Sequence, residues 1–74
     1  MTYTVIVLYQ TKDICHNWTE VTSYKLDTKS FEDASRDCLN WMTPDNSIRI
    51  VSLGFFEWNS EEQSLRTIYK YDKN

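Results

Sequence analysis

The strongest constraint on the fold is a pair of segments that alternate like β-strands and yet carry apolar side chains on both faces. Residues 3–9 place Tyr and Val residues on one face and Ile6 and Leu8 on the other. In residues 48–56, one face is predicted to hold Ile48, Ile50 and Phe56, and the other Val51, Leu53 and Phe55. Because a sheet needs only one apolar face to pack on a helix, we expect both segments to be central strands whose second face is covered by another surface.

The length of the chain allows one small domain. At 74 residues, folding buries only about 60% of the surface of the unfolded chain, so a partner surface would add to a marginal core. One Gly, one Pro and the lack of any repeat give no sign of a linker or a second domain. We therefore expect residues 1–74 to form a single α+β domain.

The clearest local signal in the sequence is a helix start at Ser30. Its hydroxyl is suited to accept a hydrogen bond from a free amide of the first turn, and Glu32 and Asp33 follow where the helix dipole favours negative charge. An apolar stripe at helical spacing is made of Phe31, Ala34, Ser35, Cys38 and Met42, flanked by Leu39 and Trp41. The opposite, polar side is made of Glu32, Asp33, Arg36, Asp37 and Asn40. Pro44 is expected to end the helix near Met42.

Four strands are expected around this helix, at residues 2–10, 17–26, 48–58 and 64–71. The second and fourth strands are richer in polar side chains, which is typical of sheet edges. A helix that returns the chain across one face, together with two hairpin connections, gives the plan β-β-α-β-β. The predicted fold is an antiparallel sheet of order 2-1-3-4 with one helix on one face, leaving the other face bare in a monomer.

The sequence predicts no catalytic, metal or cofactor site. Cys15 and His16, the only histidine, are adjacent, and a catalytic Cys-His pair is assembled from distant segments with a third group that orients the histidine. Adding Cys38 does not give a recognisable set of zinc ligands, and a single glycine, Gly54, cannot make a phosphate-binding loop. The protein is therefore expected to be non-enzymatic and to use no cofactor.

Aromatic side chains on the strands are the first candidate binding surface, made of Tyr3, Tyr9, Phe56, Trp58, Tyr69 and Tyr71. Tyr and Trp often carry the binding energy of protein interfaces, and rings on an open sheet can also stack on single-stranded nucleic acid. A net charge of −3 with scattered basic residues disfavours direct nucleic-acid binding, so a protein contact is preferred. A single-strand binder and an accessory subunit of an enzyme are the alternatives, and a homodimer through the same face is left open.

Carboxylates on the outer side of the predicted helix are the second candidate, made of Glu32, Asp33 and Asp37, with Asp45 following. Spaced carboxylates can imitate phosphates and dock in the basic, nucleic-acid-binding surface of another protein, although Arg36 interrupts this row. The alternative is a helix face that is only solvated.

The plan runs through four segments, TYTVIVLY, KSFEDASRDCLNW, IRIVSLGFF and LRTIYKY, which cover nearly the whole chain. In its small size, acidity, few cysteines and β-β-α-β-β order, the chain resembles the anti-CRISPR proteins, small phage-encoded inhibitors of host defence. The resemblance implies a stoichiometric inhibitor that covers the surface of a nuclease or nucleic-acid-binding complex. The opening residues lack a basic leader region and no apolar stretch is long enough to span a membrane, so a cytoplasmic protein is expected. The resemblance implies that this is the cytoplasm of the host.

Overall fold

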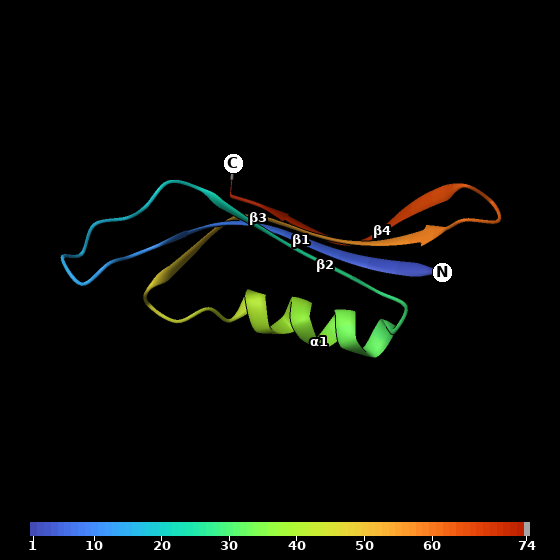
Figure 1. The fold of residues 1–74 in the computed structure, drawn as a ribbon, viewed down its shortest axis with the longest axis horizontal. Helices are drawn as coiled ribbons and strands as arrows, with labels where there is room; N and C mark the ends of the chain where they lie inside the picture. The colour runs from blue at the N-terminus through green and yellow to red at the C-terminus, as the bar shows by residue number, and fades with distance from the viewer. Residues whose placement is uncertain (74) are drawn as a thin grey trace.

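The computed structural model describes residues 1–73 and shows the predicted order of elements. These are β1 (Thr2–Thr11), β2 (Thr22–Thr28), α1 (Phe31–Met42), β3 (Ile48–Asn59) and β4 (Ser64–Asp72). The strands form one antiparallel sheet in the order β2-β1-β3-β4, with α1 on one side, which confirms the predicted α+β fold. In Figure 1 the helix lies below the sheet and no element lies above it.

The first hairpin differs from the prediction in where its second strand begins. Residues 17–21 were expected in that strand, but β2 starts at Thr22, and before it only Trp18 makes an isolated bridge, to Lys12. Residues 12–21 instead form a loop that projects from one end of the sheet, opposite the end that carries the β3–β4 hairpin (Figure 1). The molecule is therefore elongated, at 49 × 22 × 15 Å.

The helix begins and ends as its sequence predicts. The backbone N–H of Asp33 donates to the Ser30 hydroxyl at 3.2 Å, which satisfies one free amide of the first turn. At the other end, the Thr43 hydroxyl donates to the Leu39 carbonyl at 3.3 Å, one residue before Pro44. Ser30 is therefore confirmed as the N-cap.

The core lies between the helix and the sheet. Its buried members are Val5, Val7, Leu53 and Phe55 from β1 and β3, and Ala34 and Cys38 from α1. The helix packs against β1, β2 and β3, and within residues 1–73 its backbone does not come close to that of β4. The core thus occupies one face of the sheet, and the helix covers three of the four strands.

A β-bulge in β3 changes which side chains share a face. The register between β1 and β3 shifts between Leu8 and Tyr9, which leaves Val51 without a partner in β1. One extra residue reverses the alternation of the strand beyond it. Ile50 therefore lies on the same face as Leu53 and packs against the core. The prediction that Ile50 and Leu53 lie on opposite faces is wrong.

A second irregularity, at Ile68 in β4, has the same effect. The register with β3 shifts there, so that Leu65 pairs with Trp58 on the bare face while Tyr69 and Tyr71 lie on the helix side. Simple alternation along residues 64–71 would group Leu65, Tyr69 and Tyr71 on one face. Together the two bulges move apolar side chains to the helix side, so the bare face is less apolar than simple alternation predicts.

Within residues 1–73, no helix has the length and apolar character that crossing a membrane requires.

Candidate functional site

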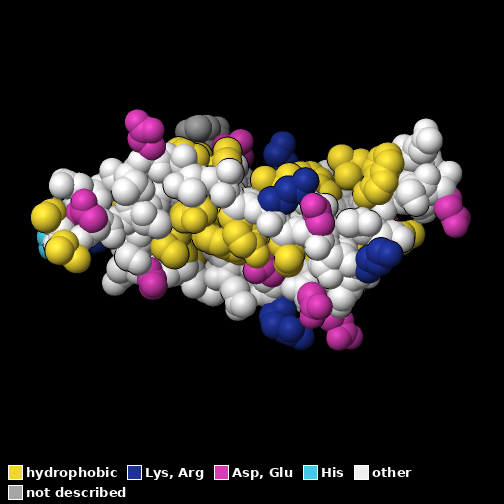
Figure 2. Space-filling view, viewed as in Figure 1, with side chains coloured by type: hydrophobic (Ala, Val, Ile, Leu, Met, Phe, Trp, Pro, Cys, Tyr) yellow, Lys and Arg dark blue, Asp and Glu magenta, His cyan; other side chains and the backbone are white. Residues whose placement is uncertain are grey.

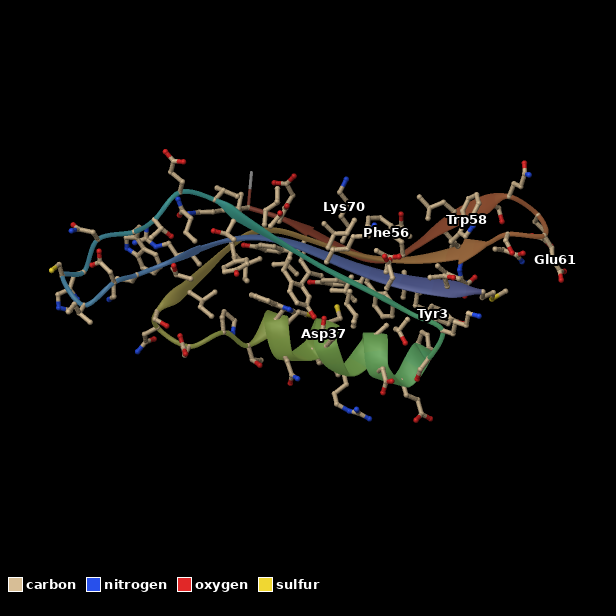
Figure 3. The ribbon with its side chains drawn as sticks, viewed as in Figure 1. Tyr3, Asp37, Phe56, Trp58, Glu61 and Lys70 are labelled. Carbon is tan, nitrogen blue, oxygen red and sulfur yellow. The ribbon has the colours of Figure 1, made fainter. Side chains whose placement is uncertain are left out.

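The face of the sheet opposite the helix, here called the open face, carries an apolar strip. Strand register places on it Ile6 and Leu8 from β1, Phe56 and Trp58 from β3, and Leu65 from β4. Ile6 is 38% exposed, Trp58 39% and Leu65 63%. Figure 3 shows Phe56, Trp58 and Lys70 on this side of the sheet, and Tyr3 and Asp37 on the side of the helix.

The space-filling view agrees with this division. Figure 2 shows apolar side chains along the seam between helix and sheet, and a second group over the end of the sheet that carries the β3–β4 hairpin. The seam is the rim of the core, whereas the second group lies over the end of the sheet where Trp58 of β3 pairs with Leu65 of β4. A further small apolar group lies at the opposite end of the molecule, over the projecting loop (Figure 2), where Ile14 is 96% exposed.

The centre of the open face is shaped by Gly54. The ring of Phe56 lies over the backbone of Gly54. Because of this, any side chain at position 54 would collide with the ring. Beside it, Ile6, Leu8 and Lys70 line a shallow hollow of about 200 Å³. The open face therefore has an apolar depression bordered by a lysine.

Two lysines lie at one level on opposite edges of this face. The register aligns Lys25 of β2 with Ile6, Ile6 with Gly54, and Gly54 with Lys70 of β4. The Lys25 ammonium lies 3.4 Å from a carboxylate oxygen of Asp27. The pKa of Asp27 is lowered from its ordinary 3.8, first by the hydrogen bond that the hydroxyl of Thr4 donates to it and then by Lys25.

Cationic side chains also surround Trp18 in the projecting loop. The Arg49 guanidinium lies 3.9 Å from the centre of the Trp18 ring and the Lys12 ammonium 5.7 Å from it. Gln10 is even-numbered, like Ile6 and Leu8 of β1, so it lies on the open face together with Arg49, with which it pairs. By the same alternation Lys12 lies on this face. The sequence pattern assigned Trp18 to a strand and gave no sign of the Arg49 contact, because the two residues are distant in the chain.

The charge of the open face differs in sign from that of the whole chain. By strand alternation its charged side chains are Lys12, Lys25, Arg49, Lys70, Asp27 and Asp72. Four basic and two acidic groups give this face a net charge of +2. Because the net charge of the whole chain is −3, the remaining residues together carry −5. The net charge of −3, which disfavoured direct nucleic-acid binding in the sequence analysis, thus does not describe this face.

The six aromatic residues singled out in the sequence do not form one platform. Tyr3 meets Phe31 edge to face at 5.4 Å between ring centres, and Tyr9 lies 4.8 Å from the ring of Trp41, so both pack under the helix. Phe56 and Trp58 lie on the open face. The remaining two are Tyr69 and Tyr71, on the helix side of the edge strand β4.

Those two tyrosines line a groove of their own. It lies between the end of α1 and β4, has a volume of about 350 Å³, and is bordered by Trp41, Pro44 and Ile50 as well as Tyr69 and Tyr71. It exists because the helix does not reach β4. No charged side chain is among its lining residues.

Asp37 does not lie on the outer side of the helix, where the helical spacing had placed it. It faces the sheet (Figure 3), and its Oδ2 is buried without a hydrogen-bond partner among the described residues. Burial raises the pKa of Tyr24, and the carboxylate of Asp37 raises it further. Burial and Asp37 likewise raise the pKa of the buried Cys38 thiol. Asp37 is therefore part of the seam between helix and sheet.

The predicted acidic row is correspondingly short. Glu32 and Asp33 are exposed on the first turn of α1, and Asp33 lies 3.4 Å from the guanidinium of Arg36. Asp45 accepts hydrogen bonds from the backbone and the hydroxyl of Ser47, which lower its pKa. These contacts leave little of a phosphate-like array on the helix.

The groups capable of nucleophilic or metal chemistry are not brought together. Cys15 is exposed in the projecting loop next to His16, while Cys38 is buried under the helix, and both thiols are free. Residues 1–73 contain no group of three His, Cys, Asp or Glu side chains placed to hold a metal ion.

Comparison of the chain with protein families, with curated proteins and with solved structures found no match.

Proposed function

We propose that this protein is a non-enzymatic protein-binding module whose open face docks on a partner protein. The observation that carries the proposal is the apolar strip of Ile6, Leu8, Phe56, Trp58 and Leu65 on the face opposite the helix. A lone exposed apolar side chain needs no explanation, but a contiguous strip with a Trp at one end has the composition of an interface core.

The size of the open face fits a small interface. Four strands about 4.8 Å apart, with four outward-facing rows about 6.8 Å apart, cover roughly 500 Å² in projection. A stable interface buries about 800 Å² of accessible surface on each partner, which side-chain relief and the rim of the face can supply. The open face alone thus accounts for most of a contact of ordinary size.

The mode of action that we propose is inhibition by occupation. The resemblance to anti-CRISPR proteins in size and plan supports a module that covers a working surface of a host-defence or nucleic-acid-binding complex. Such a module needs only to bind its partner tightly, and the apolar strip of the open face is a surface suited to binding.

Two leucines of equal exposure on opposite sides of the molecule test the docking role. Leu65 on the open face is 63% exposed and Leu39 on the helix is 60% exposed. We expect Leu65→Glu to abolish recovery of the partner in affinity purification from host lysate, and Leu39→Glu to leave it unchanged, with circular dichroism confirming that both variants fold. Equal recovery with both variants would refute the docking role of the open face.

One observation favours a second candidate, binding of single-stranded nucleic acid. The Phe56 ring lies over Gly54 beside Lys70, which places an aromatic face next to a cation as in sheets that stack bases. This candidate predicts that a labelled oligothymidine binds at low salt, that binding weakens steeply with added salt, and that Phe56→Ala removes it. An unchanged fluorescence anisotropy of the oligonucleotide at low salt would exclude it.

A further inference from the structure

We infer that a second copy of the chain pairs with β2, so that two sheets join edge to edge through antiparallel β2 strands. The inference concerns the edge of the sheet and not its open face, and it stands apart from the docking role proposed above. It is carried by a short charge pattern on β2 that is complementary to itself.

The edge strand β2 is regular and uninterrupted. It keeps one continuous register with β1, contains no proline, and has no strand beyond it within residues 1–73. Sheet edges are commonly shielded from further pairing by a bulge, a proline or a covering loop. The other edge strand, β4, is interrupted by its bulge at Ile68, so β2 is the edge better suited to accept another strand.

The backbone of β2 offers hydrogen-bonding groups on its outer side. The N–H of Thr19 donates to the carbonyl of Thr11 at 2.8 Å, which shows that odd-numbered residues of β1 bond toward the β2 side. Their partners in β2 are even-numbered. Because the N–H and C=O groups alternate sides along an antiparallel strand, the odd-numbered residues of β2 direct theirs outward. These residues are Ser23, Lys25 and Asp27.

One register of two antiparallel β2 strands sets opposite charges against each other. With Leu26 at the two-fold axis, Lys25 of each copy lies opposite Asp27 of the other copy. Directly opposite residues have Cβ atoms about 5 Å apart, whereas two residues along one strand span about 6.8 Å. Lys25 and Asp27 already form an ion pair of 3.4 Å within one chain, so they are placed at least as well to pair across the axis.

The neighbouring registers lose this complementarity. An axis at Lys25 sets the two lysines against each other, and an axis at Asp27 does the same with the two aspartates. An axis between two residues places helix-side residues opposite open-face residues. Leu26 is thus the position that satisfies both charge and face, and there its side chain meets its own copy on the side of the core.

The helices leave room for this contact. Because α1 packs against β1, β2 and β3, it is centred over β1 and not over the edge of the sheet. In the joined sheet the two β1 strands lie three strand spacings apart, roughly 14 Å, and two helices in contact need only about 8 to 10 Å between their axes. The two-fold axis closes the assembly at two copies and makes the two open faces continuous.

Analytical ultracentrifugation of the whole protein tests the inference. We expect the mass to rise with concentration from 8.9 kDa to twice this value. Lys25→Asp and Asp27→Lys each set like charges against each other across the axis and should raise the dissociation constant about tenfold or more. The matched control is Lys70→Asp, at the same level on β4, which should leave the dimer unchanged.

Mixing the two β2 variants tests the register itself. The Lys25→Asp chain carries two acidic groups where the Asp27→Lys chain carries two basic ones. An equimolar mixture should therefore form a heterodimer under conditions in which each variant alone is monomeric. Circular dichroism checks that both variants fold.

Hydrogen exchange on the unaltered protein provides a second measurement that needs no variant. At high concentration the amides of Ser23, Lys25 and Asp27 should exchange about tenfold more slowly than in dilute solution, because they then bond across the axis. The amides of Tyr24 and Leu26, which bond to β1, should be protected at both concentrations. Equal exchange of the three outward amides at both concentrations would overturn the inference.

Three other outcomes would also overturn it. A monomeric mass up to about 1 mM would show that the edge does not pair. A mass that grows beyond two chains would indicate open-ended pairing of β2 with β4, and a dimer that both β2 variants leave intact would indicate another surface. None of these outcomes bears on the docking role of the open face, which the comparison of Leu65→Glu with Leu39→Glu decides.

Discussion

Leucine-to-alanine substitutions at three positions should separate side chains that hold the fold from side chains that face a partner. Leu53 is 2% exposed in the core, whereas Leu65 on the open face is 63% exposed and Leu39 on the helix 60% exposed. The same chemical change at each site removes the same atoms. Any difference in the free energy of unfolding therefore reports how much the rest of the chain covers each side chain.

The magnitude for Leu53 follows from its burial. Removing three buried carbon atoms costs about 2.4 kcal/mol at 0.8 kcal/mol for each, and the cavity left in the core brings the loss to about 3 to 4 kcal/mol. A domain of 74 residues has a total stability of roughly 4 to 11 kcal/mol, so Leu53→Ala removes a large share of it. Leu65→Ala and Leu39→Ala should each cost less than about 0.5 kcal/mol.

Urea denaturation followed by tryptophan fluorescence measures these differences. With an m-value of about 1 kcal/mol per molar urea, Leu53→Ala should lower the midpoint by about 3 M or unfold the protein in buffer. The midpoints of the other two variants should shift by less than about 0.5 M. If Leu65→Ala cost as much as Leu53→Ala, the open face would be covered by the chain itself and the reasoning would be refuted.

Three further predictions concern the open face, the helix and pH. Gly54→Ala should force the Phe56 ring off the sheet, visible as large changes in the ring's proton shifts, and an unchanged Phe56 spectrum would contradict the packing described. Ser30→Ala should cost about 1 kcal/mol because it removes the cap that accepts from the Asp33 amide, measured by thermal unfolding with Ser35→Ala as control. Because the pKa of Asp27 is lowered in the fold, its contribution to stability is complete above pH 3.8 and is lost as the pH falls through the lowered pKa. Asp27→Asn should therefore make the stability fall less steeply with decreasing pH in this acid range. An unaltered fall in the variant would count against the contact between Asp27 and Thr4.

The architecture could be predicted from local signals because each of them agrees with the fold. The Ser30 cap and the stop at Pro44 define the helix, and the more polar strands occupy the edges as expected. The strand order then follows from short connections and from the helix crossing one face. In these elements local preference and global packing coincide.

The faces of the sheet could not be predicted from alternation, because the two bulges depend on how strands pair. An extra residue at Val51 places Ile50 with the core, and the shift at Ile68 separates Leu65 from the tyrosines of β4. Neither position carries a sequence signal, since both are ordinary β-branched residues. Simple period-two counting therefore assigned several apolar side chains to the wrong side.

The charge of the candidate site was also hidden in the composition. A net charge of −3 describes the whole chain, while strand register gathers four basic side chains and only two acidic ones, Asp27 and Asp72, on one face. The acidic row on the helix was overestimated in the same way. Asp37 lies at the margin of the apolar stripe of the helix, and its carboxylate is turned toward the sheet, so it does not contribute to the acidic outer surface. Partner chemistry is set by the faces and not by the sum of charges.

Hydroxyl-radical footprinting by mass spectrometry tests the central claim most directly. In the dilute protein alone, Leu65 should be oxidised about as readily as Leu39, and Trp58 should also be oxidised, whereas in the complex recovered with its partner only Trp58 and Leu65 should be protected. Protection of Trp58 and Leu65 in the dilute protein alone, or protection of Leu39 in their place in the complex, would contradict the account.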